Sequence, residues 1–190
     1  MRDLVAALAL GLTLLSAAPA QAASYAIDAT HTFVNFEVLH LGLSTSRGRF
    51  DKSEGTLEFD RAARKGRVDI TIDIASVNTG VPALDQELKG DKFFDIGKFP
   101  SARFVSDRFA FKGDKLAEVA GALTLLGKTL PVTLRAARFN CYLHPFLKVE
   151  ACGGDFETTI ERTRWGMSTY APDLVADKVR LVLQIEAIRQ

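Results

Sequence analysis

Hydrophobic and polar residues alternate along most of the chain after its first two dozen positions. The clearest runs cover residues 68–74 and 179–185, in which every second residue is Val, Ile or Leu. Because successive side chains of a β-strand point to opposite faces, this pattern predicts strands with one apolar face. Several such strands in series, with no long helical pattern, favour a closed or sandwiched antiparallel sheet.

The alternation predicts about eight strands and one short helix. The expected strands cover residues 25–27 continued by 32–39, then 50–59, 67–75, 102–111, 115–125, 128–140, 148–160 and 178–187. Residues 42–48 are expected to form a polar bend, and the strand over 50–59 is expected to be interrupted near Gly55. The helix is expected over residues 81–89, with Asn78 and Thr79 as its candidate caps. These elements fit a small antiparallel barrel, whose inner face packs solidly or holds an apolar ligand.

Residues 1–22 predict a cleavable signal peptide. Leu4 to Ala18 is a nearly continuous apolar run, shorter than the ~20 residues of a membrane-spanning helix. Ala20-Gln21-Ala22 then offers a small-x-small cleavage pattern. The alternative is a buried N-terminal helix. We therefore expect export to the periplasm without a stable membrane anchor, and one domain over residues 23–190.

The composition narrows the class of partner. The formal net charge is +1, so no basic excess favours nucleic acid or an anionic membrane surface. The aromatic residues are mainly phenylalanine, with 13 Phe against 3 Tyr and 1 Trp. Because Phe carries no polar group, this excess suits a dry interior or a site for an apolar ligand.

The two cysteines, Cys141 and Cys152, flank a segment that predicts a hairpin tip. Export to an oxidising compartment favours a disulfide between them. The alternative is a metal site that uses both cysteines and His144, although zinc sites favour closer cysteine spacing and a further ligand. No metal site is expected.

Short motifs then occur in order along the chain and carry a family resemblance. They are Tyr25-x-Ile27-Asp28-x-x-His31, Phe36-x-Val38-x-His40, Gly48-x-Phe50, Phe93-Phe94-Asp95-Ile96-x-Lys98-Phe99-Pro100, Gly121-x-Leu123-Thr124 and Arg162-x-x-Trp165-Gly166-Met167. On these motifs the chain resembles the YceI-like family of exported polyisoprenoid-binding proteins. It departs from the common pattern at Glu87, Trp165 and Ala176, where many members have His, Phe and Gly.

The resemblance implies a lipocalin-like antiparallel β-barrel with an apolar lumen. That lumen would hold a long isoprenoid chain, such as the tail of a quinone or a polyprenyl compound, with no other cofactor. The resemblance implies no established reaction, and it makes a homodimer plausible.

The expected ligand-binding residues follow from the inward faces of the strands. The wall candidates are Val34, Phe36, Val38, Ile70, Ile72, Leu123, Leu181 and Leu183. The alternative for each of them is ordinary core packing. Phe93, Phe94 and Phe99 form a separate aromatic cluster on an irregular segment, which acts either as a lid over one barrel end or as a plug of the core.

The polar candidates are few. His31, His40, Arg162 and Arg164 are candidates for contact with a ligand head group. Asp28 and His31 are spaced to orient a general base or to form a structural hydrogen bond. No nucleophile elbow and no His-Glu-x-x-His motif is present, so we expect a binding protein rather than an enzyme. The alternatives are an exported stress or interaction protein with a packed barrel, and an enzyme that acts on an isoprenoid.

Overall fold

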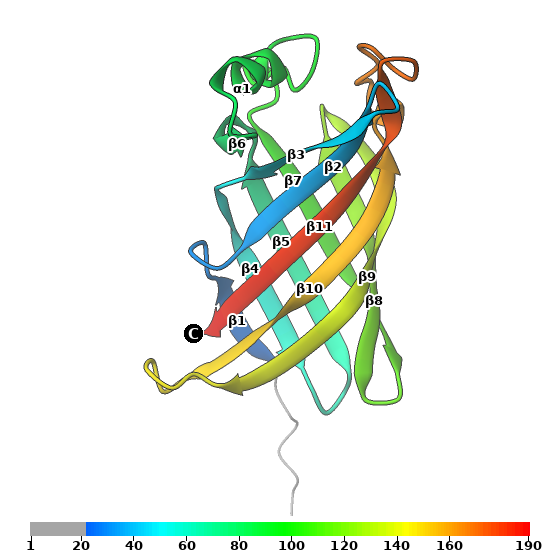
Figure 1. The fold of residues 1–190 in the computed structure, drawn as a ribbon. Helices are drawn as coiled ribbons and strands as arrows, with labels where there is room; N and C mark the ends of the chain where they lie inside the picture. The colour runs from blue at the N-terminus through cyan, green and yellow to red at the C-terminus, as the bar shows by residue number, and fades with distance from the viewer. Residues whose placement is uncertain (1–21) are drawn as a thin grey trace, which may run out of the picture.

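Eight strands close into an antiparallel barrel in the computed structural model, which describes residues 22–190 (Figure 1). The ring consists of β1 (Ala23–Ile27), β4 (Ser53–Asp60), β5 (Lys65–Asp73), β7 (Ser101–Lys112), β8 (Lys115–Leu125), β9 (Lys128–Leu143), β10 (Glu150–Glu161) and β11 (Val175–Arg189). It is closed because β11 pairs with both β10 and β1. This architecture confirms the predicted antiparallel barrel with one short α-helix. The predicted signal peptide lies outside the described residues except for Ala22.

Three further strands extend one side of the ring. β2 (Phe33–His40) pairs with residues 175–184 of β11, next to the stretch of β11 that pairs with β1. β3 (Ser44–Phe50) pairs with β2, and the two-residue strand β6 (Val77–Asn78) pairs with β3. β1 and β2 thus follow one edge of the long strand β11, with residues 28–32 as a joint between them.

The predicted polar bend at residues 42–48 is wrong. Only Leu41, Gly42 and Leu43 form the turn, and β3 then pairs with β2 residue by residue from Ser44 to Phe50. The alternation that marks other strands is missing from β3 because most of its residues are at least partly exposed near the rim. Its hydrogen-bonded partner β2, rather than an apolar face, makes this segment a strand.

The predicted interruption near Gly55 is also misplaced. The chain breaks between β3 and β4 at Asp51 and Lys52, whereas β4 continues through Gly55. Gly55 has φ +151° and lies against the backbone carbonyl of Asp69 on β5, so a Cβ atom would collide there. Glycine at this position reflects a close approach of two strands rather than the end of one.

The helix α1 (Pro82–Lys89) begins after the N-cap residue Val81, and the predicted caps Asn78 and Thr79 are wrong. Instead, the Asp85 carboxylate accepts a 2.7 Å hydrogen bond from the Thr79 backbone N–H. Proline at the first helical position suits the helix start, since its missing N–H would have no helical partner. No helix in residues 22–190 is long and apolar enough to span a membrane.

The buried hydrophobic core lies inside the barrel and includes residues of all eight strands of the ring. α1 and the irregular segment of residues 90–100, termed the lid segment, lie at one end, together with the β10–β11 loop of residues 162–174. We call this end the mouth. The turns β4–β5, β7–β8 and β9–β10 lie at the opposite end (Figure 1).

Candidate functional site

Two apolar cavities lie inside the barrel. The upper cavity, near the mouth, has a volume of about 120 Å³, and the lower cavity has about 60 Å³. Val34 and Ile72 line both cavities, so these two side chains stand between them. The upper wall consists of Val34, Phe36, Val38, Phe50, Ile72, Ile74, Leu88, Phe93, Phe94, Ala102, Leu123, Leu125, Ile160, Arg162, Met167, Val175, Val179 and Leu181. The lower wall includes Ile70, Phe104, Phe109, Phe139, Phe156 and Leu183.

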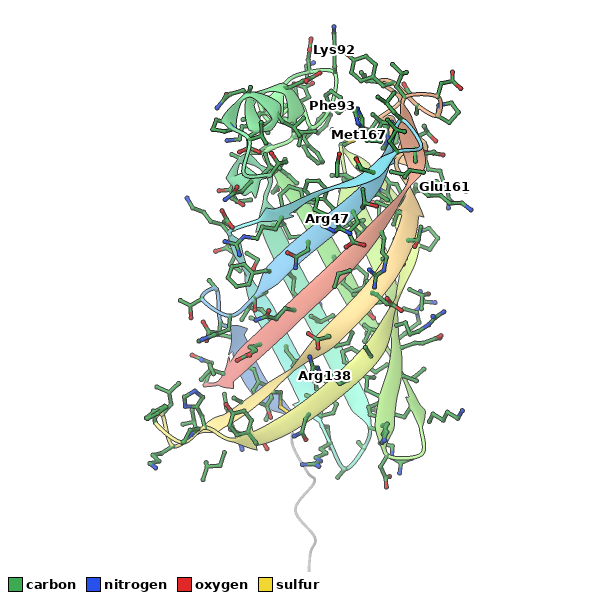
Figure 2. All side chains as sticks on the ribbon, in the orientation of Figure 1. Arg47, Lys92, Phe93, Arg138, Glu161 and Met167 are labelled. Carbon is green, nitrogen blue, oxygen red and sulfur yellow. A yellow bond between two sulfur atoms is a disulfide. The ribbon has the colours of Figure 1, made fainter. Side chains whose placement is uncertain are left out.

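The lid segment closes the mouth above the upper cavity. Phe93 is buried and Phe94 is half-buried, and the Phe94 ring meets the Phe50 ring edge-on with centroids 5.5 Å apart. Both phenylalanines line the cavity, and Figure 2 shows Phe93 and Met167 at this end of the barrel. The backbone N–H of Phe94 donates to the carbonyl of Leu88, which folds the segment back onto the end of α1.

The β10–β11 loop supports the lid segment from the opposite side of the mouth. The Thr169 hydroxyl donates a 2.7 Å hydrogen bond to the carbonyl of Lys92, and the Phe93 and Tyr170 ring centroids lie 6.1 Å apart. Two segments far apart in the sequence are thus joined across the mouth.

Five phenylalanines close the opposite end of the lumen. The Phe59 ring packs against those of Phe109, Phe111 and Phe139, and the Phe139 ring also packs against Phe156. The centroid separations range from 5.3 to 6.4 Å. We call this group the phenylalanine plug. Three of its members, Phe109, Phe139 and Phe156, also line the lower cavity.

Glycines make room for two of the inward-facing rings. Gly48 lies opposite Phe36 in the β2–β3 pair, and a Cβ atom on Gly48 would collide with the Phe36 ring. In the same way, a Cβ atom on Gly121 would lie 2.6 Å from the Phe104 ring. Both rings lean over a neighbouring strand at a position where only glycine leaves space. The shape of the lumen therefore depends on Gly48 and Gly121 as well as on its apolar wall.

Among residues 22–190, Arg162 is the one charged residue on the upper wall. The residue is 4% exposed, and its guanidinium donates hydrogen bonds of 2.9–3.0 Å to the backbone carbonyls of Met167, Thr169, Val175 and Ala176. Burial lowers the pKa of Arg162, and the nearby Asp177 carboxylate opposes that shift. The guanidinium thus organises the β10–β11 loop while it borders the cavity.

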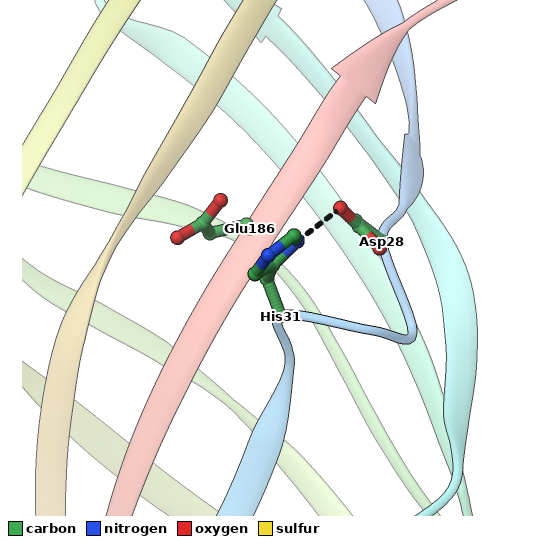
Figure 3. Close-up of side chains that lie close together, drawn as sticks. All are labelled: Asp28, His31 and Glu186. Carbon is green, nitrogen blue, oxygen red and sulfur yellow. Dashed lines mark hydrogen bonds and ion pairs between the residues drawn. The ribbon is translucent and has the colours of Figure 1, made fainter.

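Asp28 and His31 form a hydrogen-bonded pair at the β1–β2 joint, outside the cavities (Figure 3). His31 Nδ1 lies 2.7 Å from the Asp28 carboxylate, which also accepts hydrogen bonds from the Thr30 N–H and hydroxyl. Burial alone would raise the pKa of Asp28, but the hydrogen bonds from His31 and Thr30 outweigh it and hold the pKa at about 2. Hydrogen bonding and attraction to Asp28 raise the pKa of His31.

Glu186 places a third potential ligand beside this pair. Oxygens of Asp28 and Glu186 and a ring nitrogen of His31 lie within 4.8 Å of one another, which is geometry that could hold a divalent cation. His31 and the Thr30 groups already occupy the Asp28 carboxylate, however. The hydrogen bonds of Asp28 therefore explain the cluster as a structural feature that stabilises residues 28–32 between β1 and β2.

The structure places ten of the eleven predicted ligand-binding residues on a cavity wall. They are Val34, Phe36, Val38, Ile70, Ile72, Phe93, Phe94, Leu123, Leu181 and Leu183. Phe99 lines neither cavity and packs over Gly127. Of the predicted head-group residues, only Arg162 borders a cavity, while His31, His40 and Arg164 are exposed elsewhere.

Sequence reasoning missed several wall residues for identifiable reasons. Ile74 and Val179 continue runs of alternation already recognised, so the pattern itself could have supplied them. Met167 and Leu88 reach the upper cavity from a loop and from α1, where a strand pattern gives no signal. Phe139 and Phe156 could only be assigned to the lower wall once the register of β9 and β10 was known.

The predicted disulfide between Cys141 and Cys152 is confirmed. The two cysteines are directly opposed in the β9–β10 pair, and the alternative metal site that uses both thiols and His144 is wrong. Cys152 also lines the lower cavity, so the cross-link lies at the base of the hairpin and against the lumen.

Comparison with known proteins finds a matching family model and similar curated proteins. The YceI-like domain matches residues 25–187. A UPF0312 protein of Pseudomonas savastanoi pv. phaseolicola is 40% identical over 143 residues, which is 74% of each chain. A UPF0312 protein of Pseudomonas paraeruginosa is 35% identical over 195 residues and 100% of each chain.

Solved structures share the barrel. BcnA of Burkholderia cenocepacia superposes with a TM-score of 0.71 at 25% identity, over 84% of this chain and 98% of that one. The YceI protein of Campylobacter jejuni gives 0.72 at 25% identity, over 80% and 90%. A polyisoprenoid binding domain from Saccharophagus degradans gives 0.62 at 17% identity, over 90% and 100%, which shows a common fold.

Proposed function

Because the chain belongs to the YceI-like family, we propose that it binds a long-chain isoprenoid lipid, of the quinone or polyprenyl type, inside its barrel. The observation that carries the proposal is the upper cavity, whose wall is apolar except for Arg162 and whose mouth is closed by the lid segment. The fold is also that of a domain from Saccharophagus degradans described as polyisoprenoid binding.

The chemistry of an isoprenoid tail suits such a lumen. The tail has many apolar carbons and almost no hydrogen-bonding groups, so it gains by leaving water for a dry wall. At ~25 cal/mol per Å², burial of a few hundred Å² contributes several kcal/mol. The loss of freedom of a flexible tail offsets part of that gain.

The size of the cavities adds a requirement. The upper cavity has about 120 Å³ and the lower cavity about 60 Å³, and the side chains of Val34 and Ile72 lie between them. A long tail that occupies both cavities therefore has to displace these two side chains, and the lid segment has to rise as the tail enters. We propose Arg162, the charged residue on the upper wall, as the residue that meets a polar head group.

The role we propose is passive sequestration or transport in the periplasm rather than catalysis. The Asp28–His31 pair is the arrangement in the sequence that most resembles a general base, and it lies outside both cavities. A tail held in the lumen does not reach it. The expected absence of a reaction and the periplasmic location both belong to this proposal.

Native mass spectrometry followed by organic extraction tests the proposal. The protein is purified from cells that express the full chain, and any bound lipid is identified. We expect a stoichiometric isoprenoid in the wild type and its loss in Ile72→Trp and Leu183→Trp, because the indole fills the lumen. Thr71→Trp is the matched control, since the neighbouring side chain in β5 points to the opposite face.

Two results would contradict this proposal. Wild-type protein that carries no lipid, and takes up none from quinones or polyprenyl phosphates, would favour an interaction protein with a packed barrel. Undiminished lipid in both lumen variants, with near-ultraviolet circular dichroism showing that they fold, would place the ligand outside the lumen.

A further inference from the structure

The β9–β10 hairpin ends in a protruding apolar tip. We define the hairpin tip as residues 142–149, Tyr-Leu-His-Pro-Phe-Leu-Lys-Val. Phe146 is 85% exposed and Leu143 is 67% exposed, and Tyr142, Leu147 and Val149 are exposed as well. Soluble proteins rarely keep several neighbouring apolar side chains in water without a reason. Neither cavity nor core uses these five side chains.

The tip is held in a fixed shape. His144 Nδ1 lies 3.3 Å from the Phe146 backbone N–H and 3.1 Å from that of Leu147, and accepts from both. The His144 N–H donates to the carbonyl of Val149 across the turn. The disulfide between Cys141 and Cys152 fastens the two strands directly below. The apolar side chains are therefore presented outward by a preorganised turn.

The same end of the barrel is basic, although the whole chain is nearly neutral. The turns at this end and their flanks, residues 60–67, 112–115 and 142–149, hold seven Lys or Arg and two Asp. All seven cations are exposed, and within residues 22–190 only Arg64 among them has an ion-pair partner, Asp114. We call this the basic end; Figure 1 shows the three turns and the projecting hairpin there.

The mouth provides an internal comparison. Its connecting segments, residues 40–44, 74–100, 125–128 and 161–178, hold seven basic and seven acidic residues. It also exposes apolar side chains, including Leu43 at 83%. Exposed leucines thus occur at both ends, but the combination of a rigid apolar tip with a positive field occurs at the basic end.

We propose that the basic end docks the barrel onto an anionic lipid surface, with the hairpin tip inserted among the acyl chains at the headgroup boundary. Peripheral membrane binding commonly combines buried apolar side chains with Lys and Arg that face anionic headgroups. A second copy of the chain fits this surface poorly, because two basic ends would repel each other. The site is independent of the lumen, so it stands whether or not an isoprenoid is bound.

Vesicle co-sedimentation tests the docking proposal. The purified protein is mixed with vesicles of equal parts phosphatidylglycerol and phosphatidylethanolamine, and separately with vesicles of phosphatidylcholine. We expect binding at least about tenfold stronger to the anionic vesicles, weakened by added salt. Phe146→Ser combined with Leu147→Ser, and separately Arg61→Glu combined with Lys65→Glu, should each lower that binding about tenfold or more.

Leu43→Ser is the matched control, because it removes an equally exposed side chain from the mouth and should leave binding to anionic vesicles unchanged. Equal binding to both vesicle types, or loss in Leu43→Ser with retention in the tip variant, would overturn the proposal. A dimer in sedimentation velocity that the tip variant abolishes would overturn it in favour of a second copy. The tip variant should still carry its isoprenoid, which separates this test from that of the lumen.

Discussion

Single residues at this site have structural roles that their type alone does not reveal. Arg162 is a cation placed beside an apolar cavity, where an unpaired charge is costly. Its hydrogen bonds to four backbone carbonyls compensate for lost water and bind the β10–β11 loop to the barrel. The sequence predicts Arg162 and Arg164 as equivalent candidates, because the direction of each side chain depends on the short 3₁₀ helix of Arg162–Trp165.

Replacement of Arg162 by Met should lower the free energy of unfolding by roughly 3 kcal/mol, because several buried carbonyls lose their donors. Arg164→Met, a change of the same kind at an exposed neighbour, should shift it by less than about 0.5 kcal/mol. Urea unfolding of the two variants measures the difference. Equal effects would mean that the guanidinium of Arg162 has no special structural role.

The Asp28–His31 pair predicts a pH window for stability. Asp28 has its pKa lowered from 3.8 to about 2, so its stabilisation is present above 3.8 and is lost as the pH falls towards 2. The pKa of His31 is raised above 6.5, so its contribution is present below that value and is lost as the pH rises through the folded value. The pair therefore stabilises the fold most between about pH 4 and 6.5.

Asp28→Asn should accordingly destabilise the protein most near about pH 5, and less at about pH 2 or pH 8. Urea unfolding across this range measures the difference from wild type, and Asp173→Asn, at an exposed carboxylate near the mouth, serves as the control. A difference that does not change with pH would show that the charges of Asp28 and His31 add nothing to the stability of the fold.

At the scale of elements, alternation predicted the strands well wherever one face is buried. It failed at β3, whose residues from Ser44 to Arg49 pair with β2 but bury no continuous apolar face. The lid segment was predicted as aromatic and irregular, with a lid and a plug of the core as alternatives, but its attachment across the mouth was not predicted. That attachment depends on contacts with the β10–β11 loop, as in the hydrogen bond from Thr169 to Lys92, which are 77 positions apart in the sequence.

Thr169→Val should loosen the lid without unfolding the barrel. It removes the hydroxyl that donates to the carbonyl of Lys92, a hydrogen bond worth about 1 kcal/mol. Amide hydrogen exchange over residues 90–99 should become about fivefold faster, while exchange in β8 stays the same. Thr163→Val, in the same loop region but bonded to Asp177, is the control. Unchanged exchange in the lid segment would show that this hydrogen bond does not limit opening.

At the scale of the whole molecule, the sequence predicted an antiparallel barrel with an apolar lumen but not how that lumen is divided. Whether inward side chains pack solidly or leave space depends on small differences in ring position, such as those set by Gly48 and Gly121. The net charge of +1 also concealed the basic end, because charge distribution follows from which turns share an end of the barrel. Both features require the three-dimensional arrangement.

If the phenylalanine plug stays packed while a lipid is bound, the lumen acts as a tube that opens at the mouth alone. A tail in such a tube leaves through the same end by which it entered. A second lipid molecule cannot displace it from the opposite end. Release is then a first-order event, whose rate is set by the mouth and is the same at any concentration of competitor. In such a protein, the rate at which one lipid replaces another is limited by release of the first and does not rise with the concentration of the second.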